Sequence, residues 1–386
     1  MIGVVGGGQL ARMLVQAAAA RQIPVAVQTG SEEDPAVEGA SRLVTADPRD
    51  VAGTRELVEG CTGITFENEW VNIDALIPLE QQGVRFRPAL AALSPLVDKL
   101  SQRQLLADLL IPSPPWCPLS LVSPAQPALP QGWSFPVMAK AARGGYDGKG
   151  TLVLKDIDAL AQLMRSVPAE DWMLEAWVNY ERELALVVSR DASGTVRAFP
   201  LVETHQSQQV CDWVLAPAAV PQAVEALAYN AASSLLTKLN YVGVLALEFF
   251  FGPAGLQVNE IAPRTHNSGH FSIEACTSSQ FDQQLCIAAG LPVPAPQLTC
   301  HGAVMVNLLG LSEGIAAPLD QRLASLRQLP DATLHWYGKT PESPGRKLGH
   351  VTVLLHGQTA EERSDQAQMI TARIRDIWPL PSTGSV

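Results

Sequence analysis

The sequence predicts a mixed α/β and α+β fold: an open parallel sheet, a central domain built around an antiparallel hairpin, and a small carboxy-terminal domain. Residues 2–27 follow the order strand, glycine turn, helix and strand, which is the βαβ unit of a parallel sheet. Residues 244–261 form two apolar segments joined by a tight turn, which predicts the hairpin. A chain of 386 residues is long enough for two or three cores. We place the domains at residues 1–95, 96–292 and 293–386.

The composition indicates a globular protein that binds neither nucleic acid nor membranes. Hydrophobic residues make up 47% of the chain, charged residues 17%, and the formal net charge is −11, with no run rich in lysine or arginine. We expect no leader and no membrane-spanning helix, because Arg12 and Arg21 interrupt the alanine-rich segment after the first strand. The six cysteines lack metal-binding spacing, which predicts reduced thiols in a cytoplasmic protein.

The glycine turn after the first strand predicts a phosphate site at a helix N-terminus. The helix is expected over residues 9–21, and Gly6, Gly8 and Ala11 match the pattern G-x-G-x-x-A of dinucleotide sites. Such a site needs an acid at the end of the second strand, where this chain has Gln28. A dinucleotide-dependent oxidoreductase is therefore disfavoured, and a monophosphate ligand is favoured.

One acid near the end of a later strand is a candidate for binding a ribose. Glu67 follows a strand that starts at residues 63–64. Open parallel sheets bind ligands at the carboxyl ends of their strands, which is where this acid is expected. A solvated loop explains the same residue equally well.

A helix is predicted from Ser94, with Pro95 in its first turn, to a stop at Pro112. Its apolar face holds Leu96, Leu100, Ala107 and Leu110. Lys99 lies on the flank of this face. The sequence alone indicates an ordinary lysine there, with its stem on apolar surface and its charge in solvent.

A strand lysine and the glycine-rich loop after it predict a site for phosphate groups. Lys140 alternates with apolar neighbours in a strand at residues 137–140, and residues 143–151 form the loop, with four glycines in seven positions. Glycine lets backbone N–H groups approach an anion, and the lysine supplies a fixed charge. Walker A spacing is absent, so this is not a P-loop. A flexible hairpin tip is the alternative.

Two further acids follow the loop. Residues 172–178 are apolar around Glu175, and such a linker can carry adenine on its backbone amides while the acid takes the ribose or the amino group. Glu183 opens the next predicted strand and is expected to face inward. Residues 191–194 then turn the chain into a partner strand at residues 195–199.

The central hairpin predicts a divalent cation between two acids. Residues 253–255 fit a three-residue loop whose glycine takes the left-handed conformation. This loop sets Gly252 opposite Leu256 and therefore Glu248 opposite Glu260, on one face. Facing carboxylates repel each other, and oxygen ligands of this kind suit Mg²⁺ held jointly with phosphates. If the register is displaced by one residue, both acids are solvated instead.

The segment after the hairpin is dense in polar groups and poor in regular structure. Proline and glycine break it, and its hydrogen-bonding residues are Asn259, Glu260, Arg264, His266, Asn267 and His270. Irregular chain with so many polar groups is usually part of a site rather than of a core.

The carboxy-terminal domain carries a local basic cluster. The domain begins with a strand at residues 303–308, after a proline-rich connection. Residues 337–339 and 344–347 then bring cations into turn-rich chain, with Arg346 and Lys347 adjacent. In so acidic a protein this cluster indicates either an anion site or a solvated turn.

Four motifs resemble the N5-carboxyaminoimidazole ribonucleotide synthetase family of ATP-grasp ligases. They are GGGQLARM in the glycine turn, GGYDGKG in the glycine-rich loop, NEIAPRTHNSGH after the hairpin, and LHWYGK followed by PGRKLGH. The resemblance covers nearly the whole chain. It implies an ATP-grasp fold behind a Rossmann-like pre-ATP-grasp domain, with residues 143–151 as a lid over the nucleotide.

The resemblance also implies the ligands of ATP and of a metal. ATP would contact Lys99, Lys140, Gly145, Tyr146, Asp147, Gly148, Lys149, Gly150, Thr151, Glu175, Ala176, Trp177, Val178, Glu183, Gln206, Asn259 and Glu260. Relatives usually have a histidine where ungapped comparison places Gln206, and this chain has His205 one position earlier, so either residue can fill that place. Glu248 and Glu260 would hold Mg²⁺ or Mn²⁺. In a regular strand Asn259 would face away from Glu260, so its role requires the strand to twist or end there.

The ribonucleotide substrate would contact a third set of residues. These are Gly8, Gln9, Leu10, Glu67, Tyr146, Asp147, Arg264, Arg346 and Lys347. By the same resemblance, Arg264 would stabilise carboxyphosphate, and His266 and Asn267 would orient this intermediate and the substrate.

The implied reaction joins bicarbonate to the amine of 5-aminoimidazole ribonucleotide in purine biosynthesis, and ATP is converted to ADP and phosphate through carboxyphosphate. A homodimer is expected by resemblance. The nearest alternative is a ligase with another acyl phosphate, such as the formate-using glycinamide ribonucleotide transformylase. A nucleotide-binding regulator without activity should have lost one metal acid, and this chain keeps both.

Overall fold

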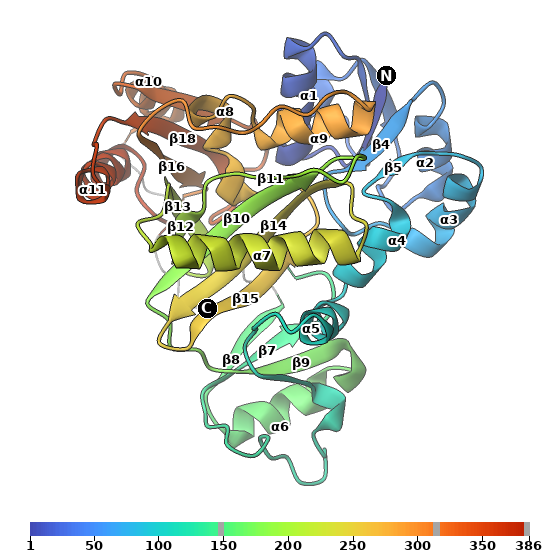
Figure 1. The fold of residues 1–386 in the computed structure, drawn as a ribbon, viewed down its shortest axis with the longest axis vertical. Helices are drawn as coiled ribbons and strands as arrows, with labels where there is room; N and C mark the ends of the chain where they lie inside the picture. Colours follow the sequence, from blue (N-terminus) through green and yellow to red (C-terminus); the bar gives the residue numbers. More distant parts are fainter. Residues whose placement is uncertain (146–149, 312–316, 382–386) are drawn as a thin grey trace.

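The computed structural model describes residues 1–145, 150–311 and 317–381, which fold around three sheets (Figure 1). The first is a parallel sheet in the order β3-β2-β1-β4-β5. Its strands are β1 (Ile2–Val5), β2 (Val25–Thr29), β3 (Arg42–Thr45), β4 (Gly63–Phe66) and β5 (Phe86–Arg87). Its helices are α1 (Gln9–Ala20), α2 (Val51–Leu57), α3 (Ile73–Gln81) and α4 (Leu90–Leu93). The predicted βαβ unit is confirmed.

The second sheet is antiparallel and forms the lobe at the bottom of Figure 1, in the order β6-β9-β7-β8. Its strands are β6 (Trp116–Pro118), β7 (Val137–Ala141), β8 (Thr151–Leu154) and β9 (Trp172–Ala176), with helices α5 (Lys99–Asp108) and α6 (Ile157–Ser166). This order places the strand that carries Lys140 directly beside the strand that carries Glu175.

The third sheet has nine strands in the order β15-β14-β10-β12-β13-β16-β18-β17, with β11 paired to β10. The strands are β10 (Arg182–Arg190), β11 (Val196–Ala198), β12 (Val202–Ser207), β13 (Val210–Ala216), β14 (Gly243–Gly252), β15 (Gly255–Ala262), β16 (Gly302–Leu309), β17 (Ala332–Trp336) and β18 (Lys347–Leu355). The remaining helices are α7 (Gln222–Lys238), α8 (Ser272–Ala275), α9 (Gln280–Ala289), α10 (Leu319–Arg327) and α11 (Ala360–Ile377). Because β13 pairs with β16, the carboxy-terminal strands extend the central sheet. The domain limits stay a prediction.

The loop of the central hairpin is shorter than predicted. Gly252 pairs with Gly255 instead of Leu256, so the loop contains only residues 253–254. Gly255 has φ +82, the left-handed conformation that closes such a turn. With this loop alone, every later pair along the hairpin would be displaced by one residue.

A β-bulge corrects that displacement before the acids are reached. Phe249 pairs with Val258, and the next pair is Glu248 with Glu260, so Asn259 is the extra residue of the bulge. The predicted pairing of the two acids is therefore confirmed. The bulge also meets the condition that the strand must change direction for Asn259 to take part in the site.

The helix expected to run on from Ser94 is wrong in two respects. Residues 94–96 form a single 3-10 turn, and Asp98 caps a separate helix, α5, by accepting a backbone N–H. Leu110 lies beyond the end of α5 with φ +54 and is 89% exposed, so it is not on a buried face. The new cap makes Lys99 the first residue of α5, close to the hairpin.

All six cysteines are free thiols, as their spacing predicted. Across the described ranges, no helix combines the length and apolarity needed to cross a membrane.

Candidate active site

Glu248 and Glu260 face each other across the hairpin at the edge of the large sheet. The side chain of Glu248 is 27% exposed and that of Glu260 is 41% exposed. Lys99 Nζ lies 2.5 Å from Glu260 Oε1, and His266 Nε2 lies 3.3 Å from Glu248 Oε1. The two acids are thus half-buried, and each already has a basic neighbour.

The pKa values of the two carboxyl groups shift in opposite directions. Burial and the charge of Glu260 raise the pKa of Glu248. Burial also acts on Glu260, but the charge and hydrogen bond of Lys99 outweigh it and lower the pKa of Glu260. A further cation would let both groups ionise. Within the described residues no three metal-binding side chains cluster. Because Mg²⁺ prefers oxygen ligands and keeps several waters, the two carboxylates fit this ion when its other ligands are phosphate oxygens and water.

A closed ring of ion pairs and hydrogen bonds lies beside these acids. Glu175 accepts Lys140 Nζ on one oxygen at 2.5 Å and Arg103 Nε on the other at 2.6 Å. Lys140 also donates to the Asn259 side chain at 3.0 Å, and Arg103 donates to the Asn259 carbonyl at 2.6 Å. The ring links the small sheet to the hairpin and fixes the lysine predicted to bind phosphates.

The side chain of Glu175 is occupied by two cations of the chain itself, and its predicted contact with the nucleotide stays a prediction. Both of its oxygens are used by Lys140 and Arg103, and only 2% of the side chain is exposed. Burial alone would raise its pKa, but the two cations outweigh burial and lower it, so the group stays ionised. Beyond Glu175 the linker leaves the sheet after Ala176, and Trp177 is exposed. Adenine contacts here are left to the backbone of residues 175–178.

A second polar corner surrounds Glu183 at the start of β10. The Tyr180 hydroxyl donates to Glu183 Oε1 at 2.6 Å, and the Gln206 side chain also hydrogen-bonds Glu183. His205 points elsewhere, with Nδ1 3.6 Å from Asp212 Oδ2. A register shift between His205 and Gln206 separates the two side chains. This geometry favours Gln206 over His205 as the residue next to the nucleotide.

The glycine-rich loop connects β7 to β8, and its second end is fixed to the small sheet. Gly150 accepts the backbone N–H of Ala141 at 2.8 Å, and Thr151 opens β8 opposite Lys140. Gly145 lies in the first half of the loop. The other predicted loop contacts lie outside the described residues: Tyr146, Asp147, Gly148 and Lys149.

The glycine turn holds a carboxylate of the chain itself at the N-terminus of α1. Glu67 accepts backbone N–H groups from Gly8 at 2.6 Å, Leu10 at 3.1 Å and Ala11 at 3.5 Å. A Cβ on Gly6 or Gly8 would lie 2.6 or 2.4 Å from Glu67, so glycine is required at both positions. Burial raises the pKa of Glu67, and these N–H groups act against that rise.

In this structure a carboxylate of the chain takes the position where a phosphate was expected, and the contacts of Gly8 and Leu10 with the ribonucleotide stay a prediction. A helix N-terminus attracts an anion, and the side chain of Glu67 already fills that position. Next to it, Lys339 donates to the side chain of Gln9, bringing a cation from the carboxy-terminal part of the chain. The corner therefore presents an acid, an amide and an ammonium group together.

Arg264 is held by an acid from the first domain. Its Nε lies 2.8 Å from Glu69 Oε2, and both side chains are largely buried. Burial would lower the pKa of Arg264, but the Glu69 carboxylate outweighs burial and raises it. The guanidinium is therefore a fixed cation in the corner between the domains. His266, two residues later, bonds Ser268 through Nδ1 at 2.9 Å and turns Nε2 to Glu248.

The side chain of Asn267 is occupied by another amide, and its role toward the substrate stays a prediction. Its side-chain amide exchanges two hydrogen bonds with that of Asn307 on β16, at 2.9 and 2.8 Å, and it is buried. Asn267 therefore anchors the loop to the large sheet.

Arg346 and Lys347, the two cations of the basic cluster, have different partners. Arg346 donates to the carbonyls of Thr340 at 3.0 Å and Pro341 at 2.9 Å, and so closes its own loop. Lys347 opens β18 and lies close enough to Glu248 for its charge to lower the pKa of that acid, against the larger effect of burial. Of the pair, Lys347 lies near the acid pair, and the Arg346 guanidinium is bound within its own loop.

Behind the site, three histidines and a tyrosine pack together. The ring centroids of His350 lie 4.5 Å from His335 and 4.9 Å from His270, and the Tyr337 hydroxyl lies 2.7 Å from His350 Nδ1. Burial lowers the pKa of both His270 and His350 well below the usual value. Both rings are therefore neutral in the folded protein at neutral pH.

This cluster predicts acid sensitivity. A lowered histidine pKa stabilises the fold fully above the unfolded pKa of about 6.5, and that stabilisation is lost as the pH falls below it. Relative to His350→Gln, the parent should lose about 1.4 kcal/mol of unfolding free energy per pH unit between about pH 6 and 5. Glu248, whose pKa is raised, changes the unfolding free energy with pH in the opposite sense. It is present in both proteins, so its contribution cancels in the comparison. Urea unfolding at several pH values measures the difference, and parallel profiles would contradict it.

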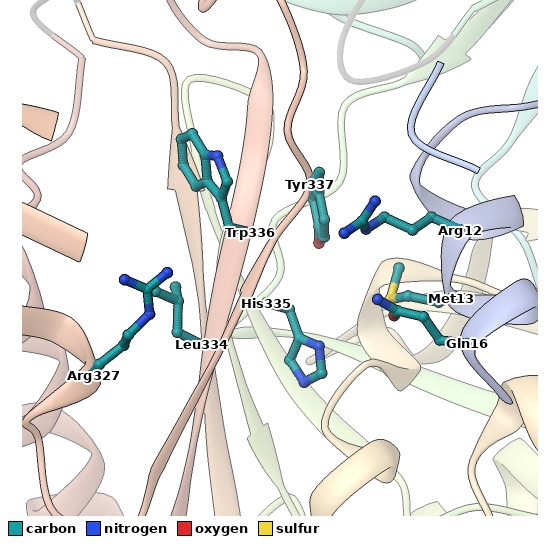
Figure 2. A pocket seen from close by; sticks show the side chains of 8 residues that line it. All are labelled: Arg12, Met13, Gln16, Arg327, Leu334, His335, Trp336 and Tyr337. Carbon is teal, nitrogen blue, oxygen red and sulfur yellow. The ribbon is translucent and has the colours of Figure 1, made fainter. Parts of the chain in front are cut away.

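A separate cavity of about 350 Å³ lies between α1 and the carboxy-terminal strands (Figure 2). Arg12 and Gln16 reach into it from α1, and His335 and Tyr337 line the opposite wall. None of the predicted site residues that the structure describes lines this cavity, so it is distinct from the acid pair and the ion-pair ring.

Family models match three successive parts of the chain. They are the ribonucleotide synthetase preATP-grasp domain over residues 1–95, the ATP-grasp domain over residues 104–281, and the phosphoribosylaminoimidazole carboxylase C-terminal domain over residues 303–364. The N5-carboxyaminoimidazole ribonucleotide synthase of Synechococcus elongatus is 47% identical over 384 residues, which cover 99% of this chain and 96% of that protein. The chain belongs to the N5-carboxyaminoimidazole ribonucleotide synthase family.

Solved synthases of this family have the same fold. The Aspergillus clavatus carboxyaminoimidazole ribonucleotide synthase complexed with ATP has a TM-score of 0.86 and 31% identity, and the match covers 97% of this chain and 98% of that one. The same enzyme in complex with ADP and 5-aminoimidazole ribonucleotide has a TM-score of 0.85 and 30% identity, with the same coverage. The ATP-grasp fold with its parallel-sheet domain, implied by the motifs, is confirmed.

Three residues of this synthase site were missed at the level of sequence. Glu69 lies two residues after Glu67, and that spacing could have indicated a second acid in the same corner. Lys339 ends the LHWYGK motif, which was noted without a role for its lysine. Arg103 carries no local signal, because an arginine in a helix usually belongs to a solvated face.

Proposed function

We propose that this protein is an ATP-dependent carbon–nitrogen ligase that carboxylates the amine of 5-aminoimidazole ribonucleotide with bicarbonate, giving N5-carboxyaminoimidazole ribonucleotide, ADP and phosphate. One observation supports this most directly: two sets of groups meet at the pair Glu248 and Glu260. Lys99 and Lys140 approach from helix α5 and the small sheet, and Arg264 and His266 approach from the segment after the hairpin, where Glu69 of the first domain holds Arg264. Phosphoryl transfer to a small anion needs cations on both sides of the transferred group.

The chemistry then runs in two steps. A bicarbonate oxygen attacks the γ-phosphorus, the bond to ADP breaks, and carboxyphosphate forms. The amine nitrogen attacks the carbon of carboxyphosphate, the C–O bond to phosphate breaks with its electrons, and the nitrogen releases a proton. Arg264 stabilises carboxyphosphate and His266 orients it. No side-chain nucleophile is required, because positioning and charge can supply the acceleration.

The nucleotide lies along the small sheet in this proposal. Lys99 and Lys140 bind its phosphates, Glu183 and Gln206 bind its sugar, and the backbone of residues 175–178 binds adenine. Glu248 and Glu260 would hold Mg²⁺, or Mn²⁺ in its place, because both metals prefer carboxylate and phosphate oxygens. Bound there, the metal neutralises charge that develops on the phosphates.

Isotope transfer tests the proposed intermediate. If bicarbonate attacks ATP, one of its oxygens becomes part of the phosphate released from carboxyphosphate. With ¹⁸O-bicarbonate in freshly prepared buffer, mass spectrometry should find one labelled oxygen in each phosphate. Unlabelled phosphate, formed while the carboxylated product accumulates, would exclude carboxyphosphate. A formate-using transformylase is the alternative, and no observation favours it.

We propose, as the resemblance implies, that Lys347 contacts the phosphate of the ribonucleotide, and this contact gives a selective prediction. Lys347→Ala should raise the apparent KM for 5-aminoimidazole ribonucleotide by about tenfold or more, since a charge-assisted contact contributes about 1.5–3 kcal/mol. The KM for ATP should change less than about twofold, because ATP uses Lys99 and Lys140. Arg346→Ala is the matched control, because the Arg346 guanidinium is bound to carbonyls of its own loop. A larger effect on ATP than on the ribonucleotide would place Lys347 in the nucleotide site instead.

We also propose that the protein acts as a homodimer in the cytoplasm: the family resemblance supports the dimer, and the six free thiols are typical of a cytoplasmic protein. Sedimentation at micromolar concentration tests the assembly, and a monomer at that concentration would contradict it.

A further inference from the structure

Helix α5 holds the outer edge of the hairpin with side chains. β15 is the terminal strand of the large sheet, so no described strand pairs with its outer edge. Gln102 takes that place at Ile261, donating to its carbonyl at 3.1 Å and accepting its N–H at 3.4 Å. Arg103 donates to the carbonyl of Val258 at 3.4 Å and to that of Asn259 at 2.6 Å. Together the two side chains bracket the β-bulge.

The bulge decides which side chains face the site. Without the extra residue, Glu248 would pair with Asn259, and Glu260 would move to the next position along the strand. A bulge leaves backbone groups of its extra residue without ladder partners, and buried groups of that kind need another partner. Arg103 supplies one, because the carbonyl that it binds at 2.6 Å belongs to the extra residue, Asn259.

Arg103 also sets the charge around Lys140. Glu175 lies between the two cations, so the three side chains carry a net charge of +1. If Glu175 had Lys140 alone, the charge of the lysine would be neutralised where it meets the phosphates. The exposed fractions of the Arg103 and Glu175 side chains are 4% and 2%, so solvent screens this balance weakly.

We propose that Arg103 is a positioning residue of the ATP site: it stabilises the bulge in β15, and through the bulge it aims Asn259 and Glu260. Arg103 lies behind Glu175 and Asn259, so it acts through them and does not contact substrate. This inference rests on the proposed function in one respect, the role of Glu260 in phosphoryl transfer. It predicts an effect on turnover and on the metal requirement, with little effect on ribonucleotide binding.

Arg103→Lys is the decisive variant. Lysine keeps the positive charge near Glu175, but a single ammonium cannot reach the acid and both bulge carbonyls as the planar guanidinium does. We expect kcat to fall at least about tenfold and the Mg²⁺ concentration for half-maximal rate to rise at least about fivefold. The KM for the ribonucleotide should stay within about twofold, since the described hydrogen bonds of Arg103 are to Glu175, Val258 and Asn259, none of which is a predicted ribonucleotide contact. Gln104→Ala, on the exposed face of the same helix, is the matched control.

Gln102→Met tests the same role without changing charge. It removes the hydrogen bonds to Ile261 and should lower kcat in the same direction, again with the ribonucleotide KM preserved. Thermal unfolding and calorimetric ADP binding establish that each variant is folded, and if one of the two does not fold, the other carries the test. Parental kcat and Mg²⁺ dependence in a folded variant would overturn the inference, as would an equal rise in the KM of every substrate.

Failure of the inference differs from failure of the proposed function. If the parent protein releases no ribonucleotide-dependent ADP, the function is wrong whatever the variants do. If the parent is active and Arg103→Lys matches it, only the role of Arg103 is wrong.

Discussion

Glu260→Gln is expected to lower kcat at least about 10²-fold, the size typical of losing one preorganised electrostatic group in an active site. Glu248→Gln should have an effect of similar size. The two carboxylates face each other in register, and the charge of each raises the cost of ionising the other, so a cation between them accounts for both. An amide at either position keeps the shape and removes the charge that holds Mg²⁺ against the phosphates.

The stability of these variants separates the metal role from a structural one. Without metal, Glu248→Gln should leave the melting temperature unchanged or raise it, because a repulsive pair is relieved. Glu260→Gln should not gain, because Lys99 loses its partner. Glu225→Gln, on the exposed face of α7, serves as the control. Near-parental ADP release by either acid variant at millimolar Mg²⁺ would contradict the metal assignment.

Arg264→Met is expected to lower kcat by about 10²–10³-fold, the range seen when a donor to a developing anion is removed. Arg264 is the buried cation that Glu69 fixes in the corner between the domains, and its charge interacts with that of Glu260. Its planar guanidinium can bind two oxygens of carboxyphosphate at once, so Arg264→Lys should recover little activity. Steady-state rates at saturating ATP and varied bicarbonate measure the loss.

Nucleotide binding provides the control for Arg264. The calorimetric affinity for ADP should stay within about twofold of the parent in Arg264→Met, because the nucleotide lies along the small sheet. Glu69→Gln should show a smaller loss of kcat, since the arginine remains but is held less firmly. An Arg264→Met protein with parental kcat, or one that loses ADP affinity instead, would remove Arg264 from the chemistry.

The pairing of the two acids was predicted correctly from a wrong loop length, because a β-bulge compensates for the difference. The loop of three residues is wrong, because Gly252 pairs with Gly255. The pairing of Glu248 with Glu260 is right because the bulge at Asn259 adds back the missing residue. A bulge depends on contacts from outside its strand, and here these come from Gln102 and Arg103 of α5. The alternation of apolar and polar residues along the hairpin sequence does not indicate such contacts.

The fold was accessible from sequence because its elements have local causes. The parallel sheet follows from glycine turns between apolar runs, and the hairpin follows from two apolar strands around a turn. Helix boundaries were less accessible where a polar residue starts a new element, as Asp98 does at α5. That cap, unrecognised in the sequence, is what brings Lys99 to Glu260.

The same distinction between local and distant causes applies to the site residues. Glu260 and Arg264 lie in one motif, and the strand lysine Lys140 lies near them, since the charge of Glu260 interacts with both cations. Their roles in the site stay predictions. Glu175 and Asn267 were assigned to ligands, and each is held by other side chains. Residue type and position cannot reveal such partners, because they come from segments far away in the chain.

Ribonucleotide-dependent ADP release tests the central claim most directly. ADP is followed in a coupled assay with bicarbonate or formate as the acid and with 5-aminoimidazole ribonucleotide or glycinamide ribonucleotide as the amine. The account predicts that only bicarbonate with 5-aminoimidazole ribonucleotide gives sustained release, with one ADP for each amine carboxylated. Sustained release with formate and glycinamide ribonucleotide, or an equal rate with no amine present, would contradict it.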